Sequence, residues 1–120
     1  MPNFNGTSGD DIFTGGAEKD TLVGNNGNDT LSGAGGDDLL VGGAGTDTLD
    51  GGDGSDTLYS GDETPPFNFP YYTTPGVAPL LDIGAEHDVL KGGAGSDRLF
   101  AGYGDDVDGG DGGADTLYVS

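Results

Sequence analysis

Large apolar residues recur at every ninth position along two stretches of this chain. Each nine-residue unit is glycine-rich at its first four positions and has aspartate at the sixth and a large apolar residue at the eighth. The eighth-position residues are Phe13, Leu22, Leu31, Leu40, Leu49, Leu58, Leu90, Leu99 and Leu117. One inward apolar residue between two outward ones makes a minimal β-strand, and glycines favour the turn before it. Each unit is therefore predicted to be a turn followed by a short strand.

The units form two blocks within one module that spans residues 1–120. The first block covers residues 6–59 and the second covers residues 83–118, with Phe4 predicted to face inward from a preceding strand. Two units would make one coil of a solenoid whose strands stack into two parallel sheets around the apolar column. The predicted fold class is all-β, a right-handed parallel β-roll with metal ions between stacked turns.

Composition and charge exclude several kinds of function. The 22 acidic and 3 basic residues give a net charge of −19, which would repel nucleic acids and anionic membranes. No apolar run is long enough to span a membrane, and there is no cysteine for disulfides or zinc thiolates. Met1–Asn5 lacks the basic and apolar regions of a secretory signal peptide, so export by a cleavable signal is not expected. No catalytic motif accompanies the single histidine, His87, which is predicted to be a surface turn residue. The chain is predicted not to be an enzyme.

The sixth-position aspartates are the candidate metal ligands. They are Asp11, Asp20, Asp29, Asp38, Asp47, Asp56, Asp88, Asp97, Asp106 and Asp115. Stacking would place carboxylates of neighbouring coils about 4.8 Å apart, where they repel each other without a cation. Calcium takes 6–8 oxygen ligands at about 2.3–2.6 Å, so one ion fits this spacing, and glycine-rich turns offer further carbonyl oxygens. Magnesium requires a tighter octahedral site, so calcium is the predicted ion.

These repeats resemble the RTX, or hemolysin-type, calcium-binding nonapeptide repeat GGxGxDxUx. The resemblance implies that calcium lies between successive turns, held by the aspartates and by backbone carbonyls of the first four positions. The carbonyls so implied belong to Gly6, Ser8, Gly9, Gly15, Gly16, Ala17, Gly24, Asn26, Gly27, Gly33, Gly35, Gly36, Gly42, Gly43, Ala44, Gly45, Gly51, Gly52, Asp53, Gly54, Gly84, Gly92, Gly93, Ala94, Gly95, Gly102, Tyr103, Gly104, Gly110, Gly112 and Gly113. It also implies a secreted bacterial protein that uses the type I secretion machinery, often as part of a larger protein.

Some residues depart from the repeat. Asp108 occupies an eighth position, where a buried carboxylate would be costly, so either the strand bulges or Val107 turns inward. The additional acids Asp10, Asp37, Asp50, Asp53, Asp62, Asp105 and Asp111 are predicted to be solvated.

Residues 60–82 interrupt the repeats and are rich in proline and aromatic residues. Leu80–Asp82 resembles the strand residues Thr48–Asp50 of a repeat unit. The insertion is therefore predicted to be an enlarged turn followed by a strand, which together make half a coil. Asp97 would then follow the insertion on the edge of Asp47, and Asp88 would follow Asp56, giving about seven calcium ions. If the insertion instead looped out wholly between strands, Asp88 would follow Asp47 and each edge would hold four sites.

Two functional hypotheses follow. The first is a calcium-binding module that folds on binding calcium after export. The second is an extracellular adhesive or carbohydrate-binding module, in which Phe67, Phe69, Tyr71 and Tyr72 form a contact for a glycan or protein. The alternative interpretation of these aromatic residues is a self-packed loop that folds back over the roll.

Overall fold

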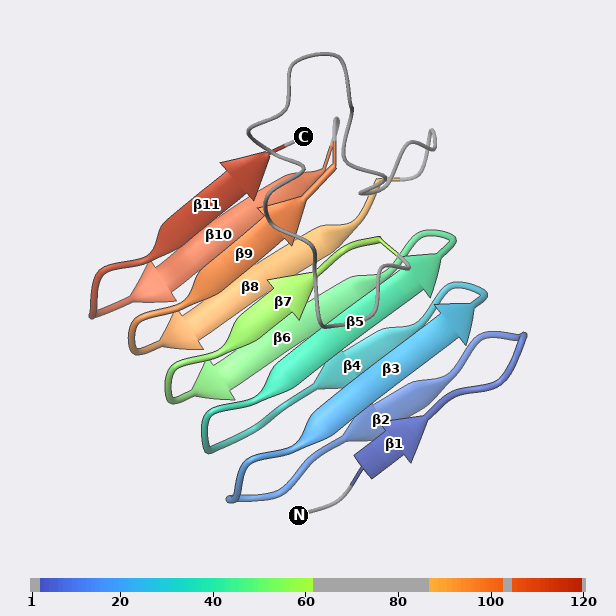
Figure 1. Ribbon diagram of the computed structural model, residues 1–120, viewed down its shortest axis with the longest axis horizontal. Helices are drawn as coiled ribbons and strands as arrows, with labels where there is room; N and C mark the ends of the chain where they lie inside the picture. Colours follow the sequence, from blue (N-terminus) through green and yellow to red (C-terminus); the bar gives the residue numbers. More distant parts are fainter. Residues whose placement is uncertain (1–2, 62–86, 103–104, 120) are drawn as a thin grey trace, which may run out of the picture.

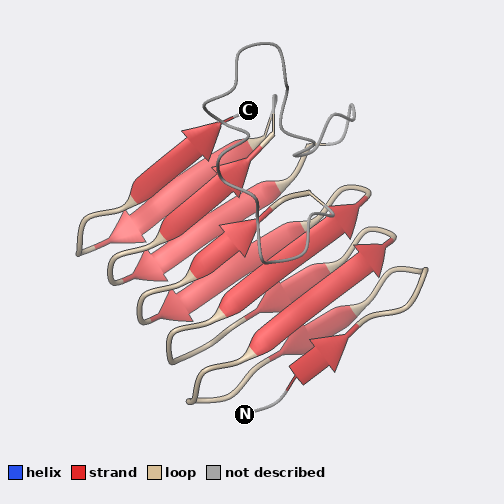
Figure 2. Cartoon of the chain, in the orientation of Figure 1, coloured by secondary structure: helices blue, strands red, loops and turns tan. Residues whose placement is uncertain are grey.

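The chain folds into short parallel strands joined by turns. This computed structural model describes residues 3–61, 87–102 and 105–119. The strands are β1 (Asn3–Asn5), β2 (Ile12–Thr14), β3 (Thr21–Asn26), β4 (Thr30–Ser32), β5 (Leu39–Ala44), β6 (Thr48–Asp53), β7 (Thr57–Tyr59), β8 (Val89–Ala94), β9 (Arg98–Ala101), β10 (Asp106–Asp111) and β11 (Thr116–Val119). Figure 2 shows no helix in the described parts of the chain, and none of these parts forms a helix that could cross a membrane.

Two parallel sheets face each other (Figure 1). One sheet has the order β1-β3-β5-β7-β9-β11 and the other has the order β10-β8-β6-β4-β2. Consecutive strands therefore alternate between the sheets, and each strand pairs with the strand two further along the chain. The predicted all-β parallel β-roll is confirmed.

The eighth-position column forms the core between the sheets. Leu22, Leu31, Leu40, Leu49, Leu58, Leu90 and Leu99 are each at most 1% exposed. Phe4 and Phe13 are partly buried against this cluster and stack with their ring centroids 4.3 Å apart. The inward position predicted for Phe4 is confirmed, and the column is continuous across the insertion.

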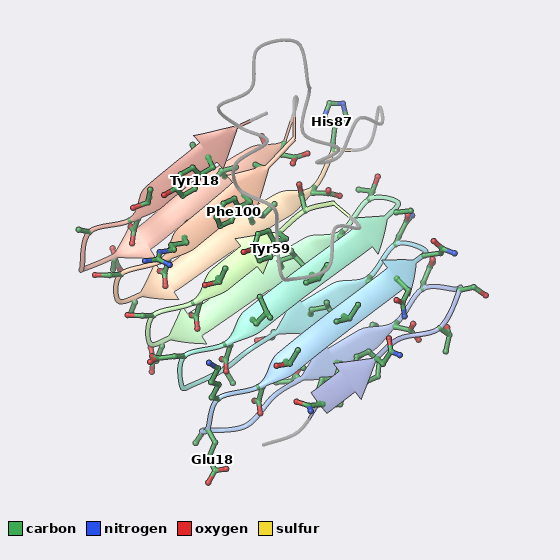
Figure 3. All side chains as sticks on the ribbon, viewed as in Figure 1. Glu18, Tyr59, His87, Phe100 and Tyr118 are labelled. Atoms are coloured by element: carbon green, nitrogen blue, oxygen red, sulfur yellow. The ribbon has the colours of Figure 1, made fainter. Side chains whose placement is uncertain are left out.

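The outer face of the six-stranded sheet carries a second apolar column that the repeat pattern did not predict. Val41, Tyr59 and Phe100, all at ninth positions, are at most 5% exposed. The rings of Tyr59, Phe100 and Tyr118 stack in sequence with centroids 4.5 Å apart (Figure 3). On the other sheet the ninth positions are polar, and Asp50 and Lys91 are exposed there. The two outer faces therefore differ in chemistry.

The predicted register across the insertion is wrong. β6 pairs with β8, with Leu49 opposite Leu90, and β7 pairs with β9, with Leu58 opposite Leu99. Neither sheet leaves a strand position for Leu80–Asp82 between these pairs. The insertion therefore lies in the chain between β7, which ends at Tyr59, and β8, which begins at Val89. Direct pairing of β6 with β8 and of β7 with β9 satisfies more backbone hydrogen bonds than an interrupted sheet would.

The nine-residue frame also shifts around β10. Val107 lies opposite Leu90 and packs on the core, whereas Asp108 lies opposite Lys91 and is exposed. The expectation that Val107 turns inward in place of Asp108 is confirmed. The shift arises because Val107 comes eight positions after Leu99 and Leu117 comes ten positions after Val107, instead of nine in each case.

Candidate metal centre

The turns place the sixth-position carboxylates along the two edges of the roll. The first edge holds Asp11, Asp29, Asp47 and Asp88, in turns that lead into the five-stranded sheet. The second edge holds Asp20, Asp38, Asp56, Asp97 and Asp115, in turns that lead into the six-stranded sheet. Each edge thus presents one carboxylate per coil, at the spacing of parallel strands.

Each carboxylate after the first on its edge accepts a hydrogen bond from the preceding turn. The amide of Asp38 donates to Asp56 Oδ1 at 2.8 Å, and the amide of Asp56 donates to Asp97 Oδ1 at 2.8 Å. Equivalent bonds of 2.6–3.1 Å join Asp11 to Asp29, Asp20 to Asp38, Asp29 to Asp47, Asp47 to Asp88 and Asp97 to Asp115. These bonds cross the insertion without interruption, so one carboxylate oxygen is fixed in every coil.

The second carboxylate oxygen lies buried on the opposite side, toward the following turn. Oδ2 of Asp29, Asp38, Asp56 and Asp97 is buried and accepts no hydrogen bond. A buried carboxylate oxygen without a partner is costly, and a cation is the natural compensation. This arrangement is the main structural argument for a metal at these edges.

The electrostatics of the edges agree with that argument. Burial raises the pKa of Asp56 to about 7, with a further increase from the charges of Asp38 and Asp97 and a partial offset by the Asp38 amide hydrogen bond. Burial also raises the pKa values of Asp29, Asp38 and Asp97, again opposed by an amide hydrogen bond. The folded chain therefore disfavours these negative charges unless a cation neutralises them.

First-position glycines give the carboxylates room. A Cβ added to Gly51 would lie against Asp56 Oδ2 and 2.6 Å from the carbonyl oxygen of Gly92 in the next coil. Gly24 and Gly33 have the same surroundings, with the next carbonyl oxygen also 2.6 Å from the added Cβ. The carboxylate and the next carbonyl therefore converge on the same bare Cα. Hard oxygens that converge in this way suit calcium.

Side chains alone would not complete a metal site. Among the described residues, no group of three or more His, Cys, Asp or Glu side chains is placed to hold a metal ion. The edges supply one carboxylate per turn, so further ligands would have to be backbone carbonyls. Carbonyl oxygens are ordinary calcium ligands, whereas transition metals prefer imidazole or thiolate groups that these turns lack.

Two positions of the predicted ligand set need correction. Asp105, which was predicted to be solvated, accepts the hydrogen bond from the preceding turn on its edge, from the Asp88 amide at 3.0 Å. Asp106, the predicted ligand, is instead exposed at the seventh position. Gly109, not Gly110, takes the first position of the last turn, where an added Cβ would lie against Asp115 Oδ2. The misplaced Asp108 was the sequence signal for both shifts.

The other additional acids divide into two groups. Asp10 and Asp37 are exposed, but each accepts a hydrogen bond from the next turn on its edge, from the amides of Asn28 and Ser55 at 2.8 and 2.9 Å. Asp50, Asp53 and Asp111 are exposed, as predicted. His87 is exposed in the turn before β8 (Figure 3).

Several predicted residues lie outside the described parts of the chain. They are Asp62, Phe67, Phe69, Tyr71, Tyr72, Gly84, Tyr103 and Gly104. The proposed aromatic contact and three of the implied carbonyl ligands therefore stay predictions.

The fold and the rows of carboxylates along its two edges define a calcium-binding parallel β-roll. A model of the RTX calcium-binding nonapeptide repeat matches residues 5–40, 32–63 and 82–117. These matches cover most of the chain, which therefore belongs to the RTX calcium-binding nonapeptide repeat family. Neither a comparison with curated proteins nor one with solved structures gave a significant match.

Low pH is expected to favour folding without calcium. Burial raises the pKa of Asp56 from 3.8 to about 7 in the fold, so protonation of its carboxyl stabilises the calcium-free fold fully below 3.8, and this contribution is lost as pH rises through 7. Acidification in excess chelator should therefore increase the β-strand signal. Circular dichroism at several pH values in excess chelator measures this change. A spectrum that does not change between acidic and alkaline pH would contradict the expectation.

Proposed function

We propose that this chain is a non-enzymatic module that stays unfolded where calcium is scarce and folds on binding calcium after export. The observation that carries the proposal is the row of buried Oδ2 atoms of Asp29, Asp38, Asp56 and Asp97, which accept no hydrogen bond. The fold brings these charges together only at a cost, and bound calcium would offset that cost. Metal binding is then coupled to folding.

The proposal includes export through the type I secretion machinery, as part of or alongside a larger secreted protein. Its support is the RTX membership together with a net charge of −19, which opposes compaction in the absence of calcium. An unfolded chain is the form that a narrow export channel would accept. The adhesive alternative depends on aromatic residues of the insertion that lie outside the described parts of the chain, and no described contact favours it.

Limited proteolysis across a range of calcium concentrations tests the proposal. A module of this kind should bind calcium at about 10⁻⁴ to 10⁻³ M, the range of extracellular calcium modules. Below that range a nonspecific protease should cleave the chain throughout, and above it the repeat blocks should be protected. Protection that is independent of calcium would argue against coupled folding.

A further inference from the structure

Two asparagines of this chain are each followed directly by glycine. They are Asn5, which ends β1, and Asn26, which ends β3, and both are exposed. Asparagine is a chemically labile residue. A following glycine makes it more reactive, because glycine has no side chain to hinder its backbone nitrogen and moves freely in an unfolded chain. No other asparagine in the sequence precedes a glycine, so these two positions are the candidates for a covalent change.

The covalent change at such a position is deamidation, which consumes only water. The glycine backbone nitrogen loses its proton and attacks Cγ of the asparagine, so that a new C–N bond closes a five-membered succinimide ring and the side-chain nitrogen leaves as ammonia. Water then opens the ring at one of its two carbonyl carbons. One opening gives aspartate, and the other gives isoaspartate, in which the main chain runs through the former side chain and is one carbon longer.

In the roll, both attacking nitrogens are held by the next strand of the same sheet or by the turn after it. The Gly6 amide donates to the Val23 carbonyl at 2.7 Å, and the Gly27 amide donates to the Ala44 carbonyl at 2.9 Å. A nitrogen that donates in this way keeps its proton and its place in the sheet, whereas the attack requires it to give up both. The folded chain therefore opposes the first step of the reaction.

The side chain of Asn5 is restrained as well. Its Oδ1 accepts a hydrogen bond from Asn25 Nδ2 at 2.9 Å, and the same Nδ2 donates to the Gly6 carbonyl at 2.7 Å. These two bonds tie the reacting side chain and the residue after it to the following coil.

Close packing removes the remaining freedom around Gly27. Its φ is 113°, in the left-handed region that favours glycine, and a Cβ added there would lie 2.5 Å from the carbonyl carbon of Gly9 in the preceding coil. The fold therefore requires glycine after Asn26. The same glycine makes Asn26 reactive in the unfolded chain and is immobilised in the roll.

The two products would affect the roll differently. Asp53 occupies the third position of its unit, as Asn26 does, and is exposed there, so aspartate at position 26 is compatible with the turn. Isoaspartate would lengthen the main chain by one carbon between Leu22, in the core, and Asp29, on the first edge. Because stacking depends on the spacing within each unit, one of these two residues would leave its row.

We propose that Asn5 and Asn26 are sites of spontaneous deamidation, that the reaction proceeds in the unfolded chain, and that the folded roll blocks it. Calcium then preserves the chain chemically as well as folding it, and a chain kept without calcium accumulates isoaspartate and loses its capacity to fold. The inference rests on the proposed function only in taking calcium as the agent that folds the chain.

Incubation of the full chain in mildly alkaline buffer tests the inference in three samples, which contain calcium, excess chelator, or chelator with denaturant. Circular dichroism records whether each sample is folded, and peptide mapping by mass spectrometry measures deamidation at each asparagine. In unfolded samples Asn5 and Asn26 should react faster than Asn28, whose next residue, Asp29, has a charged side chain. In folded samples both rates should fall by at least about tenfold, the factor that corresponds to about 1.4 kcal/mol of local opening.

Asn26→Gln is the matched variant, because glutamine is polar and similar in size but would have to close a six-membered ring. Its deamidation should be confined to Asn5. After long incubation in chelator, the variant should recover the strand signal on addition of calcium more fully than the parent chain does. Equal recovery would overturn the claim that modification at position 26 impairs folding.

The remaining outcomes separate this inference from the proposed function. Equal rates at Asn26 and Asn28 in unfolded samples would overturn the site, and equal rates at Asn26 in folded and unfolded samples would overturn the protection. A chain that is folded in chelator would contradict the proposed function but should still react slowly there, with the denaturant sample as its unfolded reference. A chain that is unfolded in calcium would also contradict the proposed function, and slow deamidation of Asn26 in it would overturn the inference as well.

Discussion

In excess chelator the chain is expected to give the circular dichroism of a disordered polypeptide, and millimolar calcium is expected to produce a strand spectrum in one cooperative transition. Without calcium, a net charge of −19 and the buried carboxylates of both edges oppose folding. With calcium, the same carboxylates become ligands. Each ion joins two coils, so the coils should fold together and not one by one. A calcium titration followed by circular dichroism, at a wavelength where β-strands give a signal, measures this transition.

Magnesium is the control for this experiment. It carries the same charge but demands near-ideal octahedral geometry and gives up its water reluctantly, so it should not restore the strand spectrum at equal concentration. A strand spectrum that persists in excess chelator would show that the core and the backbone ladders suffice without metal. A strand spectrum induced equally by magnesium would show that screening of charge, and not a defined site, drives folding.

The variant Gly51→Ala is expected to weaken calcium-dependent folding strongly. The added methyl group would collide with Asp56 Oδ2 and lie 2.6 Å from the Gly92 carbonyl oxygen, which is backbone and has little freedom to move. Overpacking of a well-packed region typically costs about 1–3 kcal/mol. The calcium midpoint should therefore rise in the titration, and Gly51→Ala should bind fewer ions at a given concentration.

Gly16→Ala is the matched control. Gly16 lies in an equivalent turn, but a Cβ added there would meet nothing within 4 Å, and its φ is not among the positive values. The same chemical change lowers the entropy of the unfolded chain in both variants, which by itself stabilises a protein by about 0.4–1 kcal/mol. Gly16→Ala should therefore fold at the calcium concentration of the parent chain or slightly below it. Equal weakening of both variants would show that turn flexibility, and not the room beside Asp56, is what matters at these glycines.

The sequence by itself determined the repeating unit, the fold class and most of the aspartates that lie along the two edges. The period of nine places one leucine and one aspartate in each unit, and this local spacing survives in nearly every coil. Leu22, Leu49 and Leu99 are buried in one column, and Asp29, Asp56 and Asp97 lie on the edges, as the period alone predicted. These features were predictable because each depends only on residues within one turn and strand.

The tertiary structure alone decided the register, because that depends on which distant strands pair. Both proposed registers across residues 60–82 keep the same period, and only the pairing of Leu49 with Leu90 and of Leu58 with Leu99 distinguishes them. The shift that brings Asp105 and Val107 into place left Asp108 as its sign in the sequence, because a shortened turn and a lengthened turn cancel and the frame is correct on both sides.

The tertiary structure also decided the backbone conformation of the turns. A residue at the second position does not reveal its φ in the sequence, yet φ is 76° at Ala34 and 80° at Asn25. The repeat therefore predicted the carboxylates but not which of their oxygens stay without a hydrogen bond. That difference arises from hydrogen bonds within and between turns, which exist only once the coils have stacked.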